Sequence, residues 1–220
     1  MKILITLGAT QEPIDPVRFI SNASSGKMGV ALAEEAARRG HEVTLVAGAV
    51  QVSLPGNIKI INVRTAHEMT DAVLFELKNN YDVFISSAAI SDYTITPGTE
   101  KIKSGKDELV LKLTPTEKLT KLVKEKFPRV YAVAFKAEHD VFDEKLIEIA
   151  YKKLKKENLD LIVANDVSKD VFGSDSNEVF ILDKNKKVIH VERNLKSVVA
   201  GKIFDAIENE MKIYKPNYNN

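Results

Sequence analysis

A short stretch near the start of the chain, RFISNASSGKMG at residues 18–29, concentrates side chains that can handle anions and acyl groups. Arg18 carries a planar guanidinium that pairs with a carboxylate or a phosphate, and the amide of Asn22 can both donate to and accept from a reacting acyl group. Two serines and Gly26 come directly before a predicted helix. Serines there cap free N–H groups, or the same N–H groups bind a phosphate, and these residues alone leave both interpretations open.

Two familiar nucleotide motifs fit this region poorly. Lys27 follows a glycine as in a P-loop, but Ser21 stands where that motif has its first glycine. Gly8 ends the first predicted strand without the G-x-G-x-x-G spacing of a dinucleotide site, and two prolines stiffen the loop that follows. Tyr151 and Lys155 have the spacing of a short-chain dehydrogenase pair, so an NAD(P)-dependent reductase is an alternative hypothesis.

Further candidates follow later strands. Asp92 comes after the small residues of SSAAIS, where a carboxylate could accept from hydroxyl or amide donors. The loop EKIKSGK at residues 100–106 carries lysines that could close over a polyphosphate or form an ordinary solvated surface. The four histidines are scattered without ligand spacing, so we predict no metal site built by the protein itself.

Strand and helix patterns alternate along the chain and predict the elements that position these loops. Predicted strands span residues 2–8, 42–48, 58–63, 82–89, 108–113, 130–137 and 159–166, with a hairpin at 178–183 and 187–192. Predicted helices span residues 26–39, 66–78, 116–126, 143–157 and 195–211. The pattern predicts an α/β fold, a Rossmann-like, doubly wound, mostly parallel sheet with a C-terminal antiparallel hairpin. Ligands of such sheets bind beyond the carboxyl ends of the strands, which is where the candidate loops fall.

Composition bounds the remaining possibilities. The 220 residues predict a single domain over 1–214, with a mobile flap at about 93–107 and a frayed tail at 215–220. Lys plus Arg total 32 against 31 for Asp plus Glu, so we expect no nucleic acid or membrane as a partner. The absence of cysteine excludes a thiolate nucleophile and disulfides. The short N-terminal apolar run is too short for a signal or a membrane span, and we expect a cytoplasmic protein.

Five segments, in order, resemble phosphopantothenate-cysteine ligases, also called phosphopantothenoylcysteine synthetases, which act in coenzyme A synthesis. They are GATQEPIDPVRFISNASSGKMG, SAAISDY, EKIK, LDLIVANDVS and FGSDSNEV, and the resemblance covers about residues 1–210. In many prokaryotes this ligase is fused behind a flavin-dependent decarboxylase. Because the first strand begins at Lys2, we expect a stand-alone ligase and a separate decarboxylase as a possible partner.

The resemblance implies a reaction. The family activates the carboxylate of 4'-phosphopantothenate with a nucleoside triphosphate, releases pyrophosphate, and lets the amine of L-cysteine displace the nucleoside monophosphate. Mg²⁺ is the implied cofactor, held mainly by phosphate oxygens and water, and CTP or ATP is the co-substrate. Glu157 stands where some bacterial members have a lysine that faces the nucleotide, which leaves the choice of triphosphate open. A non-catalytic nucleotide-binding protein is the remaining alternative.

The resemblance also implies site residues. Asn22, Arg18 and Lys101 match catalytic positions, with Arg18 reaching the phosphopantothenate of the other subunit in a homodimer. Ala88, Ala89 and Asp92, together with Asn22 and Arg18, match the substrate-binding positions. The implied nucleotide-binding residues are Gly8, Ser24, Gly26, Gly29, Asp92, Lys101, Phe135, Lys153, Lys156 and Asn165.

Overall fold

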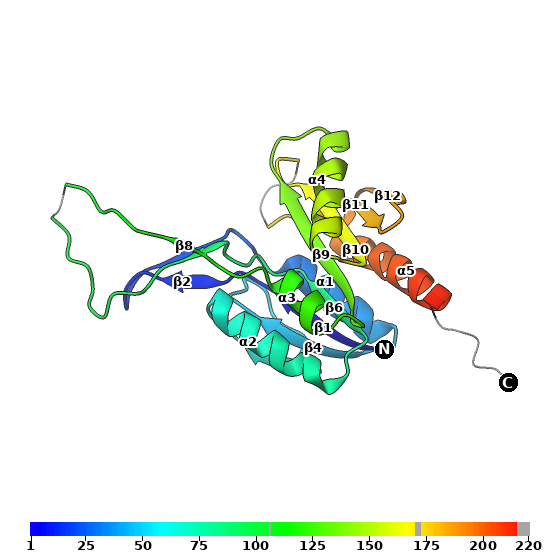
Figure 1. The fold of residues 1–220 in the computed structure, drawn as a ribbon, viewed down its shortest axis with the longest axis horizontal. Coiled ribbons are helices and arrows are strands. Elements are labelled where there is room, and N and C mark those ends of the chain that lie inside the picture. Colours follow the sequence, from blue (N-terminus) through cyan, green and yellow to red (C-terminus); the bar gives the residue numbers. More distant parts are fainter. Residues whose placement is uncertain (106, 170–172, 215–220) are drawn as a thin grey trace.

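An eight-stranded sheet carries the fold in a computed structural model that describes residues 1–105, 107–169 and 173–214 (Figure 1). The strands are β1 (Lys2–Leu7), β4 (Glu42–Ala47), β5 (Lys59–Asn62), β6 (Val83–Ser86), β9 (Tyr131–Glu138), β10 (Leu161–Asp166), β11 (Ser176–Asp183) and β12 (Val188–Leu195). Their order is β12-β11-β10-β9-β6-β1-β4-β5. Neighbours from β5 to β10 pair parallel, whereas β11 and β12 are added antiparallel, so the predicted fold class is confirmed. The tail predicted to fray, 215–220, lies outside the described residues.

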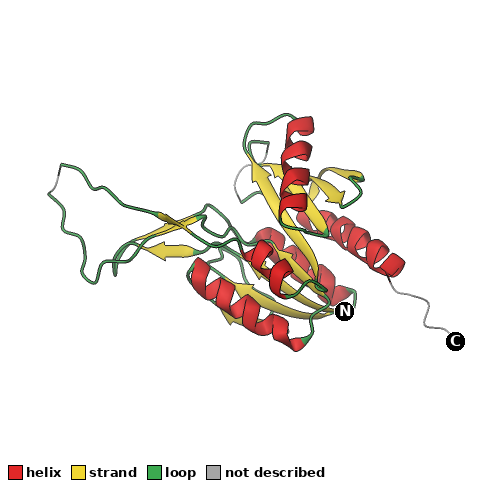
Figure 2. Ribbon diagram, viewed as in Figure 1, coloured by secondary structure: helices red, strands yellow, loops and turns green. Residues whose placement is uncertain are grey.

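Helices cover both faces of the sheet (Figure 2). They are α1 (Lys27–Arg38), α2 (Ala66–Glu76, continued by the 3-10 turn Leu77–Asn79), α3 (Leu119–Lys126), α4 (Asp143–Lys156) and α5 (Lys196–Tyr214). Leu32 of α1 and Phe204 of α5 share one buried apolar cluster, while Met69 of α2 and Val123 of α3 share another. The central strands are apolar runs because both of their faces are buried. Within the described ranges, no helix is both long enough and apolar enough to cross a membrane.

An arm extends from the body of the molecule (Figure 1). We define it as residues 11–21, 93–105 and 107–115. It contains the hairpin of β2 (Gln11–Pro13) with β3 (Phe19–Ser21), which the sequence did not predict, and the short pair of β7 (Tyr93–Thr94) with β8 (Thr114–Pro115). The predicted mobile flap falls in this arm, and its mobility stays a prediction.

The prediction of a strand at residues 108–113 is wrong, because the structure has no strand there. The alternating apolar residues of this segment predict one buried face, but Leu109 is 48 % exposed and Val110 is 79 % exposed on the arm. A strand of this kind needs a neighbour to pair with, and in the described part of the arm no strand pairs with this segment.

Two buried carboxylates hold the base of the arm in place. Glu12 is 2 % exposed and accepts from the backbone N–H of Ala66 at 2.8 Å and from Thr94 Oγ1 at 2.7 Å. Asp15 is equally buried and accepts from the backbone N–H groups of Arg18 at 2.8 Å and Ile102 at 3.1 Å. The two sequence-distant halves of the arm are therefore held to each other and to the start of α2.

Candidate functional site

Two adjoining cavities open at the carboxyl end of the parallel strands, beside β1 and β6, where the direction of strand addition reverses. The main cavity has a volume of about 810 Å³, and the small cavity beside the start of α1 has a volume of about 140 Å³. The residues that line both are Ala23, Met28, Ser87, Asn165, Val167 and Asn177. The two cavities therefore share a wall where one elongated ligand could occupy both.

The small cavity lies against the start of α1. Gly26 is the N-cap residue of this helix, with a φ of 82°, and as a glycine it makes no capping hydrogen bond through a side chain. Among the described residues, Ser25 Oγ accepts from the N–H of Lys27 at 3.4 Å, so the predicted capping by the serines is found only as this one long hydrogen bond. The N–H groups of the first turn and the positive end of the helix dipole therefore face a cavity of the kind that binds phosphate.

Close backbone packing explains why glycines occur in this loop. A Cβ on Gly29 would lie 2.3 Å from Leu7 Cβ, and a Cβ on Gly8 would lie 2.5 Å from the carbonyl oxygen of Ala49. Gly8 also has a φ of 78°, which other residues adopt at a cost. The glycines thus let α1 begin directly against the end of β1, and Ser24, Gly26 and Gly29 all line the small cavity.

Asn22 joins the first loop to the loop after β6. Its Nδ2 donates to the carbonyl oxygen of Ala89 at 3.3 Å, and the N–H of Ala89 donates to the carbonyl oxygen of Gly8 at 2.8 Å. Asn22, Ala88 and Ala89 all line the main cavity. The small alanine side chains occupy little of the main cavity, and the Asn22 amide lies beside them, held by the Ala89 carbonyl.

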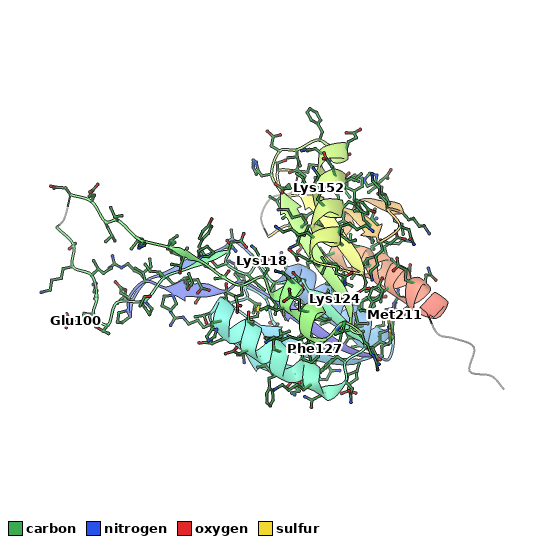
Figure 3. All side chains as sticks on the ribbon, viewed as in Figure 1. Glu100, Lys118, Lys124, Phe127, Lys152 and Met211 are labelled. Carbon is green, nitrogen blue, oxygen red and sulfur yellow. The ribbon has the colours of Figure 1, made fainter. Side chains whose placement is uncertain are left out.

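Positive charge predominates in the main cavity. The lysines are Lys118, Lys136, Lys152, Lys153 and Lys156, and the acidic residues are Asp92, Glu117 and Glu157. Lys118 forms an ion pair with Asp92, and Lys153 Nζ lies 2.8 Å from Glu157 Oε1. Lys118 precedes α3 and Lys152 projects from α4, so distant elements supply these cations (Figure 3). Neither was predicted, although the lysine-rich pattern of α4 was a signal for Lys152.

The structure brings the other predicted nucleotide residues to the same place. Phe135 from β9, Asn165 from β10, and Lys153 and Lys156 from α4 all line the main cavity. Gly8 lies beneath the small cavity, with its Cα 3.7 Å from where a Cβ on Gly26 would be.

Arg18 and Lys101 are placed differently, because they lie in the arm and line neither cavity of their own chain. The Arg18 guanidinium binds the Asp15 carboxylate and donates to the carbonyl oxygen of Ile102 at 3.0 Å. The hydrogen bond from Arg18 holds the pKa of the Asp15 carboxyl well below its usual range, although burial opposes this shift. Their predicted roles in catalysis stay predictions.

The residues on which the reductase and P-loop interpretations depend do not show the expected arrangement. Tyr151 and Lys155 do not line the main cavity; Tyr151 donates to the carbonyl oxygen of Lys184 at 3.4 Å, and Lys155 Nζ lies 5.4 Å from the Tyr151 ring centroid. Lys27, considered as a P-loop lysine, lines the small cavity, but its Nζ donates to the carbonyl oxygen of Gly173 at 2.5 Å and to Asp175 Oδ1 at 2.6 Å. The geometry supports neither a dehydrogenase pair nor a P-loop.

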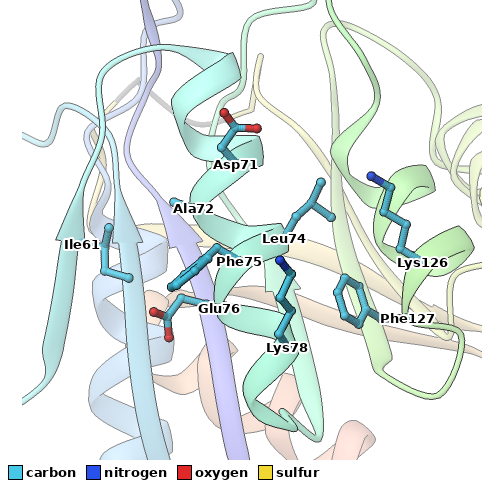
Figure 4. A pocket seen from close by; sticks show the side chains of 9 residues that line it. All are labelled: Ile61, Asp71, Ala72, Leu74, Phe75, Glu76, Lys78, Lys126 and Phe127. Atoms are coloured by element: carbon cyan, nitrogen blue, oxygen red, sulfur yellow. The ribbon is translucent and has the colours of Figure 1, made fainter.

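Another hollow, of about 700 Å³, lies between α2 and the end of α3 (Figure 4). Leu74 and Phe75 of α2 and Phe127 after α3 give it an apolar lining. It contains none of the predicted site residues, so the candidate site is the pair of cavities at the carboxyl edge.

A family model and several curated proteins match most of the chain. The family model described as the DNA/pantothenate metabolism flavoprotein C-terminal domain matches residues 1–211. The coenzyme A biosynthesis bifunctional protein CoaBC of Thermococcus kodakarensis is 45 % identical over 212 residues, covering 94 % of this chain and 51 % of that protein. The chain spans about half the length of the curated relatives it matches.

Solved structures agree with this match. The C-terminal domain of a CoaBC protein superposes with a TM-score of 0.80 at 35 % identity, covering 96 % of this chain and 95 % of that one. A Cab2 mutant complexed with phosphopantothenate-cysteine superposes with a TM-score of 0.77 over 97 % of this chain and 88 % of that one. At 18 % identity, the second likeness shows the fold alone.

Proposed function

The chain belongs to the family of the DNA/pantothenate metabolism flavoprotein C-terminal domain, and from this membership we propose that it is a phosphopantothenate-cysteine ligase. The observation that carries the proposal is that one loop supplies both the phosphate cradle at the start of α1 and Asn22 in the wall of the adjoining cavity. An enzyme that joins a carboxylate to a nucleotide needs these two functions next to each other.

In the proposed first step, a carboxylate oxygen of 4'-phosphopantothenate attacks the α-phosphorus of CTP or ATP, and the bond to pyrophosphate breaks. In the second step, the amine of L-cysteine attacks the acyl carbon, loses a proton, and the nucleoside monophosphate leaves. We assign the Asn22 amide to the acyl oxygen, where a fixed donor stabilises the negative charge that develops. The N–H groups at Gly26 and the cavity lysines offset the charge of the phosphates.

Mg²⁺ is part of this proposal. Among the carboxylates that line the main cavity, Asp92 and Glu157 are each already paired with a lysine. This donor set fits an ion held mainly by phosphate oxygens and water, which Mg²⁺ commonly prefers at nucleotide sites. When bound, the ion would supply charge neutralisation at the phosphates.

We also propose a homodimer. The arm exposes apolar side chains, including Val17 at 60 %, Phe19 at 45 % and Val110 at 79 %. Such side chains support a contact with a second copy of the chain. Because Arg18 and Lys101 lie in this arm, a partner's cavity is a place where they could act. A cytoplasmic location and a separate phosphopantothenoylcysteine decarboxylase as a partner belong to the same proposal.

Pyrophosphate release tests the function directly. We expect release from either CTP or ATP with Mg²⁺ only when 4'-phosphopantothenate is present, and amide product only when L-cysteine is added. If neither nucleotide gives pyrophosphate release, the proposal is contradicted. An NADPH titration serves as the control for the reductase alternative, and we expect no saturable fluorescence change.

A further inference from the structure

The Asn177 side chain is buried without a hydrogen-bond donor for its oxygen. The residue is 7 % exposed, and among the described residues nothing donates to its Oδ1. An unpaired acceptor in such a place destabilises the folded chain, so it is seldom kept without a use. The sequence segment that holds it, FGSDSNEV, belongs to the family resemblance, but its spacing alone gave Asn177 no role.

Asn177 stands where the two cavities meet. It lies at the start of β11 and lines both the main and the small cavity. Two other polar side chains share this position. Ser87 is already engaged, because its Oγ donates to the carbonyl oxygen of Thr6 at 2.6 Å. Asn165, from the neighbouring strand β10, is the other. The junction is therefore a site with two amide side chains, one of which has an unpaired buried oxygen.

The order of base, ribose and phosphate in a nucleotide determines which of these groups would lie at this junction. The start of α1 in the small cavity suits phosphates, while Phe135 and Lys156 line the main cavity, where a base would lie. Ribose is the group that connects base and phosphate. A phosphate oxygen only accepts hydrogen bonds and cannot satisfy Asn177 Oδ1, whereas a hydroxyl both donates and accepts and so suits either end of the amide.

We propose that Asn177 binds a ribose hydroxyl of the nucleotide and makes the site select ribonucleotides over their deoxy analogues. The inference rests on the proposed function, because it takes the co-substrate to be a nucleoside triphosphate. It adds a contact between sugar and protein that the phosphate cradle and Asn22 do not provide.

Binding measured without turnover tests this contact. Titration calorimetry with Mg²⁺ would compare CTP and ATP with their 2′,3′-dideoxy analogues, and the 2′-deoxy and 3′-deoxy forms would identify the hydroxyl. We expect wild type to bind the ribonucleotide roughly tenfold more tightly than the dideoxy form. Asn177→Ala and Asn177→Leu should bind both forms equally. Asn185→Ala, which removes an exposed amide from the turn before β12, should behave as wild type.

Folding is checked in the same variants. Asn177→Leu replaces the amide with an apolar group of similar size, so its unfolding temperature should equal or exceed that of wild type. A lower unfolding temperature together with retained discrimination would show that the amide serves the fold, and would overturn the proposal. Equal binding of both nucleotide forms by wild type would show that water satisfies the amide, and would overturn it as well.

The two proposals can fail separately. If wild type releases pyrophosphate as expected but Asn177→Ala still discriminates between the sugars, the ribose contact is wrong and the ligase assignment stands. If discrimination depends on Asn177 but no pyrophosphate is released with 4'-phosphopantothenate, the ribose contact stands and the ligase assignment is wrong.

Discussion

Asn22 and the phosphate cradle share one loop, so a single substitution can separate chemistry from nucleotide binding. Asn22→Ala removes the amide that reaches Ala89 at 3.3 Å but leaves Gly26 and α1 unchanged. We expect wild-type nucleotide binding, amide formation slowed by roughly 100-fold or more, and accumulation of the acyl-nucleotidylate. Chromatography of the reaction mixture measures the amide product and the acyl-nucleotidylate, and titration calorimetry measures nucleotide binding. Asn57→Ala, at an exposed turn, is the control, and full activity of Asn22→Ala would refute the assignment.

Gly29 permits the close contact between α1 and β1, and its replacement should show the cost of separating them. In Gly29→Ala the new Cβ would lie 2.3 Å from Leu7 Cβ and 3.0 Å from Ser87 Oγ. We expect the free energy of unfolding to fall by about 1–3 kcal/mol, because overpacking forces the helix away from the strand. Urea titration measures it. Gly56→Ala, which meets no atom within 4 Å, should leave stability unchanged. Equal effects at the two sites would contradict this account.

How far the sequence reveals the site depends on which residues come from one segment. Asn22, Ser24 and Gly26 could be predicted because a single loop carries them and their spacing is visible. Asn177 and Lys118 could not, because their position at the cavity depends on which strand lies beside β10 and on where α3 begins.

At the scale of elements, the carboxylate of Asp166 ties the end of β10 to the turn after β9. It accepts from the N–H groups of Asp140 at 3.0 Å, Val141 at 3.1 Å and Ser168 at 2.9 Å. Burial raises the pKa of Asp166, but hydrogen bonds from Ser168 and these N–H groups outweigh it and lower the pKa to about 2, from 3.8. Since the folded pKa is depressed, the stabilisation is complete above pH 3.8 and is lost as the pH falls towards 2.

We therefore expect Asp166→Asn to be less stable than wild type at neutral pH, with the difference shrinking as the pH falls from about 4 to about 2. Urea unfolding across this pH range measures the difference. Asp140→Asn makes the same chemical change at an exposed neighbour and is the control. A difference that stays constant with pH would show that the carboxylate charge is not what stabilises the turn.

Elements were predictable where burial imposes a pattern. The central strands form continuous apolar runs because helices cover both faces, and their alternation with helices predicted the parallel sheet. The arm follows no such constraint. Its hairpin of β2 and β3 depends on the buried Glu12 and Asp15, whose partners come from distant segments, and residues 108–113 alternate without a strand beside them.

At the scale of the whole molecule, the proposed exchange of Arg18 between subunits predicts complementation. Asn22→Ala and Arg18→Gln, each inactive alone, should regain roughly a quarter of wild-type activity when mixed and allowed to exchange subunits, because mixed dimers contain one intact site. Gln retains a hydrogen-bond donor for Asp15. Activity assays after mixing measure the gain.

The control for complementation replaces the Arg18→Gln chain with the double variant Asn22→Ala/Arg18→Gln, which should give no rescue with Asn22→Ala. If the first mixture shows only the mean of its two components, Arg18 does not act across a dimer. Sedimentation of wild type checks that a dimer forms.

The direction of β1 affects how a product could move from the cavities to a catalytic unit joined at the start of the chain. The six residues from Lys2 to Leu7 span about 20 Å, so the start of the chain lies at the edge of the sheet opposite the cavities. Between the two edges, Ile3, Leu4 and Ile5 are fully buried and fill the interior. Within one chain, a catalytic unit joined ahead of Met1 would have no passage through the sheet to the cavities. A product released at the carboxyl edge would therefore have to pass around the sheet to reach such a unit, because the buried strands close the direct path.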